Sequence, residues 1–461
     1  MKSDLGHVSG LSGAKVAVIG LGASGVAAAR LALVKQGEVY VSDLGTDAQT
    51  AARGAQLREL GADVQVGGHD LERMAEADLV VASPGIPPDA PVLRALANRG
   101  KRWISEPEFA VRFYRGSLIA ITGTNGKTTT SMLTAHLLET AGHRVALGGN
   151  VGGGMAPAAA ELALLEPAPE WYVLELSSFQ LAGIETLRPD IGVVTNLSPD
   201  HLDRYESLDA YYADKARLFD NADEASRWVL PIADGPVDDL VASAPGARFR
   251  FGGDAGDESN AFMDDGVLTL RTGSEADALL PEADVPLLGR HNRLNALTAA
   301  LTARLAGASI EGIAEGLATA RPLRHRLEPV VERDGVLWVN DSKATNVAAT
   351  RSALESLERP VVLVAGGKDK GEDFRGMRAS LAGVRTVVVF GAAADRLAEE
   401  LEGAAELVRM GDDFSEVLRT AKDLARAGDI VLLSPACSSF DMFDDYEDRG
   451  RRFTDLAGEI A

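Results

Sequence analysis

Short apolar runs alternate along the chain with stretches typical of helices. The first group of runs is KVAVIG, EVYVSD and ADLVVASPG, and the second is SLIAITG, WYVLELSS and DIGVVTN. The third group is VLWVND, PVVLVAGG, RTVVVFG and DIVLLSPA. Apolar runs bounded by turn residues predict buried strands, and their alternation with helical segments is typical of parallel sheets covered by helices. The pattern therefore predicts an α/β protein.

The chain is too long for one ordinary hydrophobic core. A single core rarely grows beyond about 250–300 residues, and this chain has 461. We place the domain boundaries where one group of strands gives way to the next, which predicts domains at 1–112, 113–322 and 323–461. An Ala- and Leu-rich helix is expected at 294–306 in the second domain.

Composition excludes several classes of protein. Sixty-eight acidic against 46 basic residues give a formal charge of -22, which disfavours nucleic acid and anionic lipid as partners. No apolar run is long enough for a membrane span, and the N-terminal stretch MKSDLGHVSG lacks the apolar core of a secretory signal. The single cysteine, Cys437, fits a reducing compartment and is interpreted as a small buried residue rather than a nucleophile. We expect a cytoplasmic monomer without membrane insertion.

The turn GLGASG, residues 20–25, follows the first predicted strand and opens a helix, and Asp43 ends the next strand. This arrangement matches the dinucleotide fingerprint, which favours a nicotinamide or flavin cofactor. Glycines let a backbone approach any diphosphate at a helix N-terminus, so another nucleotide fits the turn as well. A merely tight turn is the third interpretation.

The stretch GTNGKT, residues 123–128, lies between a predicted strand and a predicted helix. It ends in the GK[ST] of a phosphate-binding loop, in which backbone N–H groups surround phosphates, Lys127 neutralises them and the Thr128 hydroxyl reaches Mg²⁺. The usual spacing places glycine at position 121, where this chain has Ile121, so the loop is a shortened form. The alternative is a glycine turn with a solvated lysine; we favour an ATP site.

Two further segments of the second group carry polar residues. Glu175 lies inside the run VLELSSFQ, which is otherwise typical of a buried strand, and it is part of a structural ion pair, an exposed strand end or a Mg²⁺ ligand. TNLSPDHLDRY follows the next strand and contains Asn196, Asp200 and His201. Ligands of α/β sheets collect at such strand ends. His201 alone would be an ordinary surface histidine, whereas the cluster favours a site.

Three segments follow strands of the third group: DSKATN at 341–346, AGGKDKGEDF with Lys368 and Lys370, and LLSPACSSFD. Each of them could be solvated loop on its own. Together, at the strand ends of one domain, they predict a site for a small polar anion.

The segments TGTNGKTTT, LELSSFQ, TNLSPDHLDRY, GRHNRLNALTA, LRHRLE, NDSKATN and LLSPACSSFDMF, in this order, resemble the Mur ligase family of peptidoglycan synthesis. The resemblance spans all three predicted domains. DSKATN and SPACSSFD are similar to the members of the family that add D-glutamate. The resemblance to the family implies a Rossmann-like N-terminal domain that binds UDP, a central P-loop ATPase-type parallel sheet and a Rossmann-like C-terminal domain that binds the amino acid.

The implied substrates are UDP-N-acetylmuramoyl-L-alanine and D-glutamate, and the implied cofactors are ATP and Mg²⁺, with Mn²⁺ as an alternative. The terminal carboxylate would attack the γ-phosphate of ATP, and the amine of D-glutamate would then displace phosphate from the acyl phosphate. By helical pattern Lys215 is a solvated lysine. It matches the family position at which lysine reacts with CO₂ to give a carbamate, which would turn a repelling ammonium into a metal ligand.

The resemblance also implies a role for individual residues. The catalytic set would be Lys127, Glu175, His201 and Lys215, and the metal ligands Thr128, Glu175, His201 and Lys215. ATP would be bound by Gly123, Thr124, Asn125, Gly126, Lys127, Thr128, Thr129, Asn292, Asn295, Arg326 and Asp341, with His325 beside Arg326. The UDP-sugar would be bound by Gly22, Ala23, Ser24, Asp43, Gly85, Asn150 and Ser177. D-Glutamate would be bound by Lys343, Thr345, Lys370, Ser439, Phe440 and Tyr446.

Other classes of function remain open at this stage. A nicotinamide-dependent oxidoreductase would use GLGASG alone and leave the phosphate loop and Glu175 without a role. A nucleotide-operated switch would use the phosphate loop but not the C-terminal segments. Within the family, a ligase for another amino acid is the nearest alternative.

Overall fold

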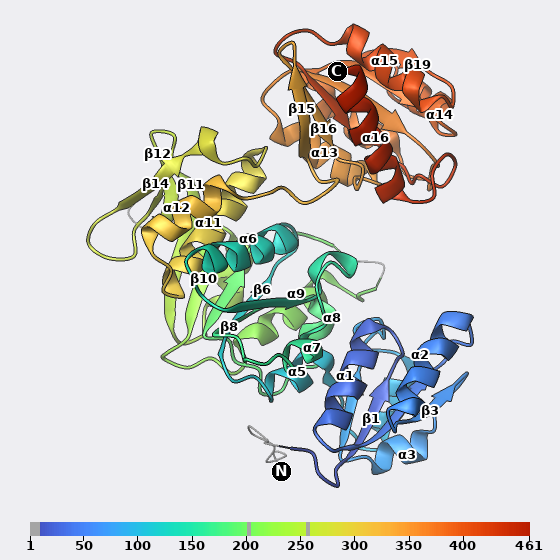
Figure 1. Cartoon of the computed structure of the whole chain (residues 1–461), viewed down its shortest axis with the longest axis vertical. Helices are drawn as coiled ribbons and strands as arrows, with labels where there is room; N and C mark the ends of the chain where they lie inside the picture. The colour runs from blue at the N-terminus through green and yellow to red at the C-terminus, as the bar shows by residue number, and fades with distance from the viewer. Residues whose placement is uncertain (1–9, 201–203, 255–258) are drawn as a thin grey trace. The chain divides into compact units, whose positions relative to one another are not determined.

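The computed structural model describes residues 10–200, 204–254 and 259–461 (Figure 1). The first compact unit comprises the described residues up to Asp284 together with Leu294–Ala318, and the second comprises Val285–Arg293 and Thr319–Ala461. The boundaries at 112 and 322 stay predictions. Within the described residues, no helix has the length and apolar character needed to cross a membrane.

The first sheet is entirely parallel, with strand order β3-β2-β1-β4-β5. Its strands are β1 (Lys15–Ile19), β2 (Glu38–Asp43), β3 (Asp63–Val66), β4 (Leu79–Ala82) and β5 (Ile104–Ser105). The helices are α1 (Ala23–Val34), α2 (Ala48–Glu59), α3 (Leu71–Glu76), α4 (Pro91–Asn98) and α5 (Glu106–Val111). The predicted strands KVAVIG, EVYVSD and ADLVVASPG are confirmed as β1, β2 and β4.

The second sheet has the order β14-β13-β12-β11-β10-β9-β6-β8-β7. Its strands are β6 (Ser117–Thr122), β7 (Val145–Gly149), β8 (Trp171–Glu175), β9 (Ile191–Val194), β10 (Arg227–Pro231), β11 (Ala247–Asp254), β12 (Ser259–Asp264), β13 (Val267–Leu270) and β14 (Asp277–Pro281). Strands β12, β13 and β14 pair antiparallel. The sheet is therefore mixed at this edge, which differs from the parallel sheet that the sequence predicted, because short hairpin connections there replace helical crossovers.

The helices of this part are α6 (Lys127–Thr140), α7 (Ala159–Leu162), α8 (Ser178–Leu181), α9 (Leu208–Ala216), α10 (Gly235–Val241), α11 (Arg290–Leu305) and α12 (Ile310–Ala318), with 3₁₀ turns η1 (Val151–Gly153), η2 (Arg217–Phe219) and η3 (Glu282–Asp284). Helix α11 confirms the helix expected at 294–306. Strands β6, β8 and β9 confirm the predicted strands of this group.

The third sheet has the order β15-β16-β20-β17-β18-β19, and only its β15–β16 pair is antiparallel. Its strands are β15 (Glu328–Arg333), β16 (Val336–Asn340), β17 (Val361–Gly366), β18 (Val384–Phe390), β19 (Glu406–Arg409) and β20 (Ile430–Leu433). Its helices are α13 (Val347–Ser356), η4 (Phe374–Gly383), α14 (Ala394–Glu400), α15 (Phe414–Leu424) and α16 (Tyr446–Ile460). Every residue of β17 is buried, as expected for a central parallel strand.

Helix α5 ties the first sheet to the second through a buried carboxylate. Glu108 accepts hydrogen bonds from the backbone N–H groups of Glu185, Thr186 and Leu187 at 3.1, 3.0 and 2.8 Å. Arg112, one turn later, lies 3.0 Å from the same carboxylate. A buried charge is tolerated when it is paired and hydrogen-bonded in this way. Glu108 therefore fixes α5 to the turn that follows α8.

Glu106, on the same helix, is buried without an equivalent set of partners. One oxygen accepts from the Ala160 N–H of α7, while Oε2 has no hydrogen-bond partner among the described residues. Burial raises the pKa of Glu106 to about 8, the Ala160 N–H opposes the rise, and the charge of Glu161 adds to it. The carboxyl is therefore held in its neutral form over much of the physiological pH range.

We predict that Glu106→Gln changes how stability depends on pH. Because the folded pKa lies above the unfolded one, the carboxyl's contribution is fully present below about pH 4.5 and is lost as pH rises toward about 8. Glutamine does not ionise, so the free energy of unfolding of the wild type relative to the variant should fall by up to ~1.4 kcal/mol per pH unit in this window. Urea denaturation over the window measures it. Glu59→Gln, at an exposed position on α2, is the control, and parallel curves for wild type and Glu106→Gln would contradict the prediction.

Candidate active site

The loop between β6 and α6 has the geometry of an anion site. Gly123 and Gly126 have positive φ angles of 139° and 80°, which glycine adopts without strain. A Cβ on Gly126 would lie 2.4 Å from Asn295 Oδ1, so a side chain does not fit there. No side chain among the described residues caps α6, and the first N–H groups of a helix attract anions. Loop and helix together can hold a phosphate.

Lys127, at the first position of α6, donates from Nζ to the Thr124 carbonyl oxygen at 2.7 Å. Thr128 is buried and Thr129 is half-buried on the following turn. Thr124 Oγ1 donates to the Ser198 carbonyl oxygen at 3.1 Å, which connects the loop to the segment after β9. The residues predicted from GTNGKT are thus grouped at the carboxyl edge of the second sheet.

Lys215 corrects the expectation of a solvated lysine. Its side chain, on α9, is 1% exposed, and Nζ donates to the Gly123 carbonyl oxygen at 2.8 Å. Burial, together with the positive charge of Lys127, lowers the pKa of Lys215 to about 7. The negative charges of Asp200, Asp214 and Glu175 act in the opposite direction. The amine is therefore neutral in a substantial fraction of molecules at neutral pH.

Glu175, the last residue of β8, is 2% exposed and lies near enough to Lys215 to influence its charge. Its Oε1 accepts a long hydrogen bond of 3.5 Å from Asn150 Nδ2, and the Asn150 N–H donates to the Glu175 carbonyl oxygen at 2.9 Å. The structure thus brings Lys127, Glu175 and Lys215 together around one loop. Sequence spacing alone could not show this, because Lys127 follows β6, Glu175 ends β8 and Lys215 lies on α9.

The donors for a divalent cation are the Thr128 hydroxyl and the Glu175 carboxylate, which are the hard oxygen ligands that Mg²⁺ prefers. Among the described residues, no group of three or more His, Cys, Asp or Glu side chains is arranged to hold a metal ion. His201 lies outside the described residues. The oxygen donors are of the kind that suits Mg²⁺, and further ligands would come from His201, a phosphate, water or a modified side chain.

Asn295 contacts the phosphate loop directly. Thr130 Oγ1 donates to Asn295 Oδ1 at 3.3 Å, and the same oxygen lies over Gly126. Asn292, one turn earlier on α11, is also buried and donates from Nδ2 to the Leu288 carbonyl oxygen at 2.8 Å. Asn295 thus lies against the loop within the first unit, and Asn292 belongs to the second unit.

A cavity of about 430 Å³ opens at the carboxyl ends of the first sheet. The expected residues Gly22, Ala23, Ser24, Asp43 and Gly85 line it, together with Asn150 and Gln180 from the second sheet's domain. Ser177 lies outside the lining, where it caps α8 in a capping box with Gln180. Six of the seven residues predicted for the UDP-sugar therefore share one cavity.

The GLGASG turn owes its shape to its glycines. A Cβ on Gly25 would lie 1.9 Å from the Gly20 carbonyl oxygen, and Gly20 itself has a φ of 102°. Both oxygens of Asp43 accept from the neighbouring backbone, from Leu21 N–H at 2.6 Å and Gly45 N–H at 2.7 Å. Asp43 therefore shapes this edge of the cavity.

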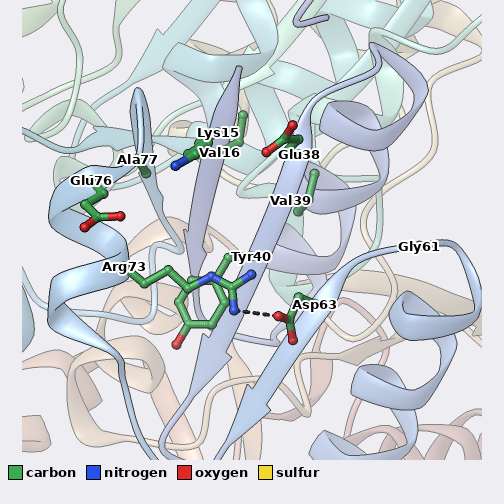
Figure 2. Close-up of a pocket in the computed structure, with 10 residues that line it drawn as sticks. All are labelled: Lys15, Val16, Glu38, Val39, Tyr40, Gly61, Asp63, Arg73, Glu76 and Ala77. Atoms are coloured by element: carbon green, nitrogen blue, oxygen red, sulfur yellow. Dashed lines mark hydrogen bonds and ion pairs between the residues drawn. The ribbon is translucent and has the colours of Figure 1, made fainter. Parts of the chain in front are cut away.

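Figure 2 shows a second hollow, of about 400 Å³, at the opposite edge of the same sheet. Its lining includes Lys15, Glu38 and Asp63, which begin β1, β2 and β3. The Arg73 guanidinium lies 4.4 Å from the Tyr40 ring centre and pairs with Asp63 at 2.5 Å. Ligands of such sheets bind at the carboxyl ends, and none of the predicted site residues lines this hollow.

In the second unit, Asp341 follows β16 and is buried. Its Oδ2 accepts from Ser434 Oγ at 2.7 Å and its Oδ1 from the Leu327 N–H at 3.2 Å. Burial raises the pKa of Asp341 to about 7, while these donors and the charge of Arg326 lower it. His325 and Leu327, which flank Arg326, both have positive φ, at 62° and 41°. Strain of this kind is common at functional sites.

The residues predicted for D-glutamate surround the same strand ends in two groups. Lys343 Nζ lies 5.4 Å from the Tyr446 ring centre. Lys370 Nζ donates to the carbonyl oxygen and the hydroxyl of Thr345 at 3.0 and 3.3 Å. Ser439 is buried and Phe440 is 68% exposed. These residues bring two cations and an exposed aromatic ring to loops of one sheet edge.

Arg449 is the residue that sequence reasoning missed in this region. It is fully buried on α16, and its guanidinium donates to Ser342 Oγ at 3.0 Å and to the Cys437 carbonyl oxygen at 3.2 Å. It also reaches the Gly366 carbonyl oxygen at 3.4 Å. One side chain thus joins the segments after β16 and β20 to the last residue of β17. Its neighbours Arg451 and Arg452 are exposed arginines of the same helix, so no local signal marks it.

Three descriptions of protein domains match the chain in order. The "Mur ligase MurD-like, N-terminal domain" matches residues 14–105, and the "Mur ligase middle domain" matches 121–303. The "Mur ligase, glutamate ligase domain" matches 325–437.

Among curated proteins, the UDP-N-acetylmuramoylalanine--D-glutamate ligase of Acidobacterium capsulatum is 41% identical over 97% of this chain and 96% of its own. That of Salinibacter ruber is 40% identical over 96% of this chain and 97% of its own.

Solved structures support the fold. UDP-N-acetylmuramate-alanine ligase MurC of Thermotoga maritima aligns over 97% of this chain and 99% of its own, with a TM-score of 0.58 at 19% identity. MurF of Acinetobacter baumannii aligns over 91% of this chain and 90% of its own, with a TM-score of 0.59 at 16% identity. With relatives of 40% identity over nearly its whole length, the chain belongs to the Mur ligase family.

Proposed function

We propose that the protein joins D-glutamate to UDP-N-acetylmuramoyl-L-alanine with cleavage of ATP to ADP and phosphate, as a step in the synthesis of peptidoglycan precursors. The observation that carries the proposal is the 41% identity, over 97% of the chain, to a ligase of this name. Two features of the structure support it. The loop after β6 forms an anion site next to the buried Lys215, and loops at strand ends of the third sheet carry the cations Lys343 and Lys370. The reaction consumes ATP, so we propose that it takes place in the cytoplasm; the monomeric state stays a prediction.

The phosphate loop would bind the ATP phosphates. The N–H groups of α6 and the Lys127 ammonium would neutralise the γ-phosphate, while Asn295 lies beside the loop at Gly126. The carboxylate of the sugar nucleotide would attack that phosphate to give an acyl phosphate. The uncharged amine of D-glutamate would then attack the acyl carbon, and phosphate would leave. Activation is needed because a free carboxylate resists attack by an amine.

Thr128 and Glu175 would hold Mg²⁺, with Mn²⁺ as an alternative and His201 as a further candidate. The cation would neutralise charge on the transferred phosphoryl group. The predicted roles of Asn292, Arg326 and Asp341 in binding ATP stay part of the proposal.

We propose that Lys215 carries a CO₂-derived carbamate. Only a neutral amine reacts with CO₂, and burial favours the neutral form of Lys215. A carbamate nitrogen keeps one hydrogen, so it can still donate to the Gly123 carbonyl oxygen, the present partner of Nζ. Its oxygens would add hard ligands to the Thr128 hydroxyl and the Glu175 carboxylate.

The cavity beside the GLGASG turn would take the UDP-sugar. Gly22 and its neighbours would meet the diphosphate, and Asn150 at the far side would meet the muramoyl-alanine end. The Lys343 and Lys370 ammonium groups would bind the carboxylates of D-glutamate, with Thr345, Ser439, Phe440 and Tyr446 around them.

The direct test is phosphate release from ATP with Mg²⁺ and UDP-N-acetylmuramoyl-L-alanine, with D-glutamate, L-glutamate, lysine or meso-diaminopimelate in separate reactions. We expect release only with D-glutamate, together with a product heavier by one glutamyl residue in mass spectrometry. Release with another amino acid would keep the family and overturn the proposed specificity. Release that is independent of any acceptor would favour a nucleotide-operated switch.

Lys127→Ala should lower kcat/KM for ATP by about 100-fold or more, because it removes a cation that neutralises the transferred phosphate. Its hydrogen bond to Thr124 is local and its side chain is half-exposed, so the melting temperature should change little. Steady-state kinetics and thermal denaturation of the same preparation measure both. Unchanged kinetics with ATP would remove Lys127 from the proposed site.

Carbamylation of Lys215 should appear as a carbamate carbon signal in NMR after incubation with isotopically labelled bicarbonate. The signal should be absent from Lys215→Arg, whose guanidinium stays charged and cannot carry the modification. It should weaken as pH falls below about 7, where the amine of Lys215 becomes protonated. Activity should decrease in CO₂-free buffer and return with bicarbonate. A fully active enzyme without the signal would contradict this role.

A further inference from the structure

Two side chains of the segment after β9 bind the phosphate loop rather than facing away from it. Asn196 Nδ2 donates to the Asn125 carbonyl oxygen at 3.0 Å, and the Asn125 N–H donates to Asn196 Oδ1 at 3.0 Å. Thr195 Oγ1 donates to the same Asn125 carbonyl oxygen at 2.6 Å. The backbone N–H and the carbonyl oxygen of Asn125 are therefore both held by side chains that lie 70 residues or more away in the sequence.

The carbonyl of Asn125 matters because of what the loop has to bind. An anion is attracted by N–H groups and repelled by carbonyl oxygens, so a phosphate loop functions only if its carbonyls point away from the phosphate. Asn125 immediately precedes Gly126, whose φ of 80° turns the chain into α6. A rotation of the peptide after Asn125 would bring its carbonyl oxygen toward the anion. Two donors on that oxygen oppose the rotation.

The backbone around the loop leaves room for these side-chain donors and aligns the two segments. The Thr124 N–H donates to the Asn196 carbonyl oxygen at 2.9 Å, which aligns the two segments. A Cβ on Gly123 would lie 2.0 Å from Thr195 Oγ1, so the glycine leaves room for the threonine hydroxyl. Thr195 is itself buried.

We infer that Asn196 and Thr195 are positioning residues of the ATP site, which hold the Asn125 carbonyl away from the phosphates and so keep the loop in its binding conformation. The inference rests on the proposed function, because it assumes that the loop binds ATP. It revises the expectation that Asn196 belongs to a ligand-binding cluster: its amide acts on the loop and not on the ligand.

The experiment uses the full chain and MgADP as the probe, with dissociation constants from calorimetry and KM values for ATP and D-glutamate from phosphate release. Asn196→Asp places a carboxylate oxygen against the Asn125 carbonyl, and Thr195→Val removes the hydroxyl at nearly constant volume. Each should raise the Kd of MgADP by about tenfold or more, as expected for the loss of a hydrogen bond and a loosened loop. KM for ATP should rise likewise, and KM for D-glutamate should not.

Thr195→Ser keeps the donor and should restore most of the affinity that Thr195→Val loses. Asn260→Ala is the matched control, because Asn260 makes the same kind of paired bonds, with Arg250 N–H at 2.8 Å and the Arg271 carbonyl oxygen at 2.8 Å, away from the loop. It should lower the melting temperature without changing the Kd of MgADP.

Wild-type affinity in both Asn196→Asp and Thr195→Val would overturn the inference, as would equal losses in Thr195→Ser and Thr195→Val. If Asn196→Asp does not fold, the comparison of Thr195→Val with Thr195→Ser tests the inference by itself. A wild-type protein that does not bind MgADP would overturn the proposed function instead, and the inference with it.

Discussion

A turn that binds phosphate through its N–H groups must find partners for its carbonyl oxygens elsewhere. In this chain the carbonyl of Thr122 accepts from the Thr195 N–H, that of Gly123 from Lys215 Nζ, that of Thr124 from Lys127 Nζ and that of Asn125 from the side chains of Thr195 and Asn196. The donors come from α6, α9 and the segment after β9. The loop is therefore shaped by the whole carboxyl edge of the sheet, and the same donors include the residues on which the proposed chemistry depends.

The linkage between the first two sheets also depends on side chains that pair with backbone groups, here carboxyl groups of α5 that accept from backbone N–H groups. Glu108 satisfies three N–H groups of one turn, and Glu106 reaches the N-terminal end of α7. Buried hydrogen bonds to carboxyl oxygens specify geometry strongly, because an unpaired buried N–H group would be costly. The cavity beside GLGASG is lined from both sides of this linkage. A sugar nucleotide bound there would consequently be held at a fixed place relative to the phosphate loop.

The sequence predicted the strands and the loops that carry the site, because apolar runs and glycine turns are local signals. It could not predict the burial of Lys215, whose neighbours on α9 read as a solvated helical surface. The partners that make burial tolerable, such as the Gly123 carbonyl, lie 92 residues away. Arg449 was missed for the same reason, since its partners lie on three other segments. The antiparallel hairpins of β12–β14 were missed because their short runs carry weak periodicity. Of the predicted metal ligands, His201 lies outside the described residues.

A chain with a formal charge of -22 is proposed to bind three anionic substrates. Backbone dipoles would supply part of the attraction at two of the three proposed places. GLGASG and GTNGKT precede helices without side-chain caps, whose N–H groups are fixed partial charges that cannot be titrated. Lys127 would add its charge to that of the helix at the γ-phosphate, and Lys343 and Lys370 would supply positive charge around glutamate. Because the field that a ligand meets is set within a Debye length of about 8–10 Å, the acidic surface elsewhere does not prevent binding.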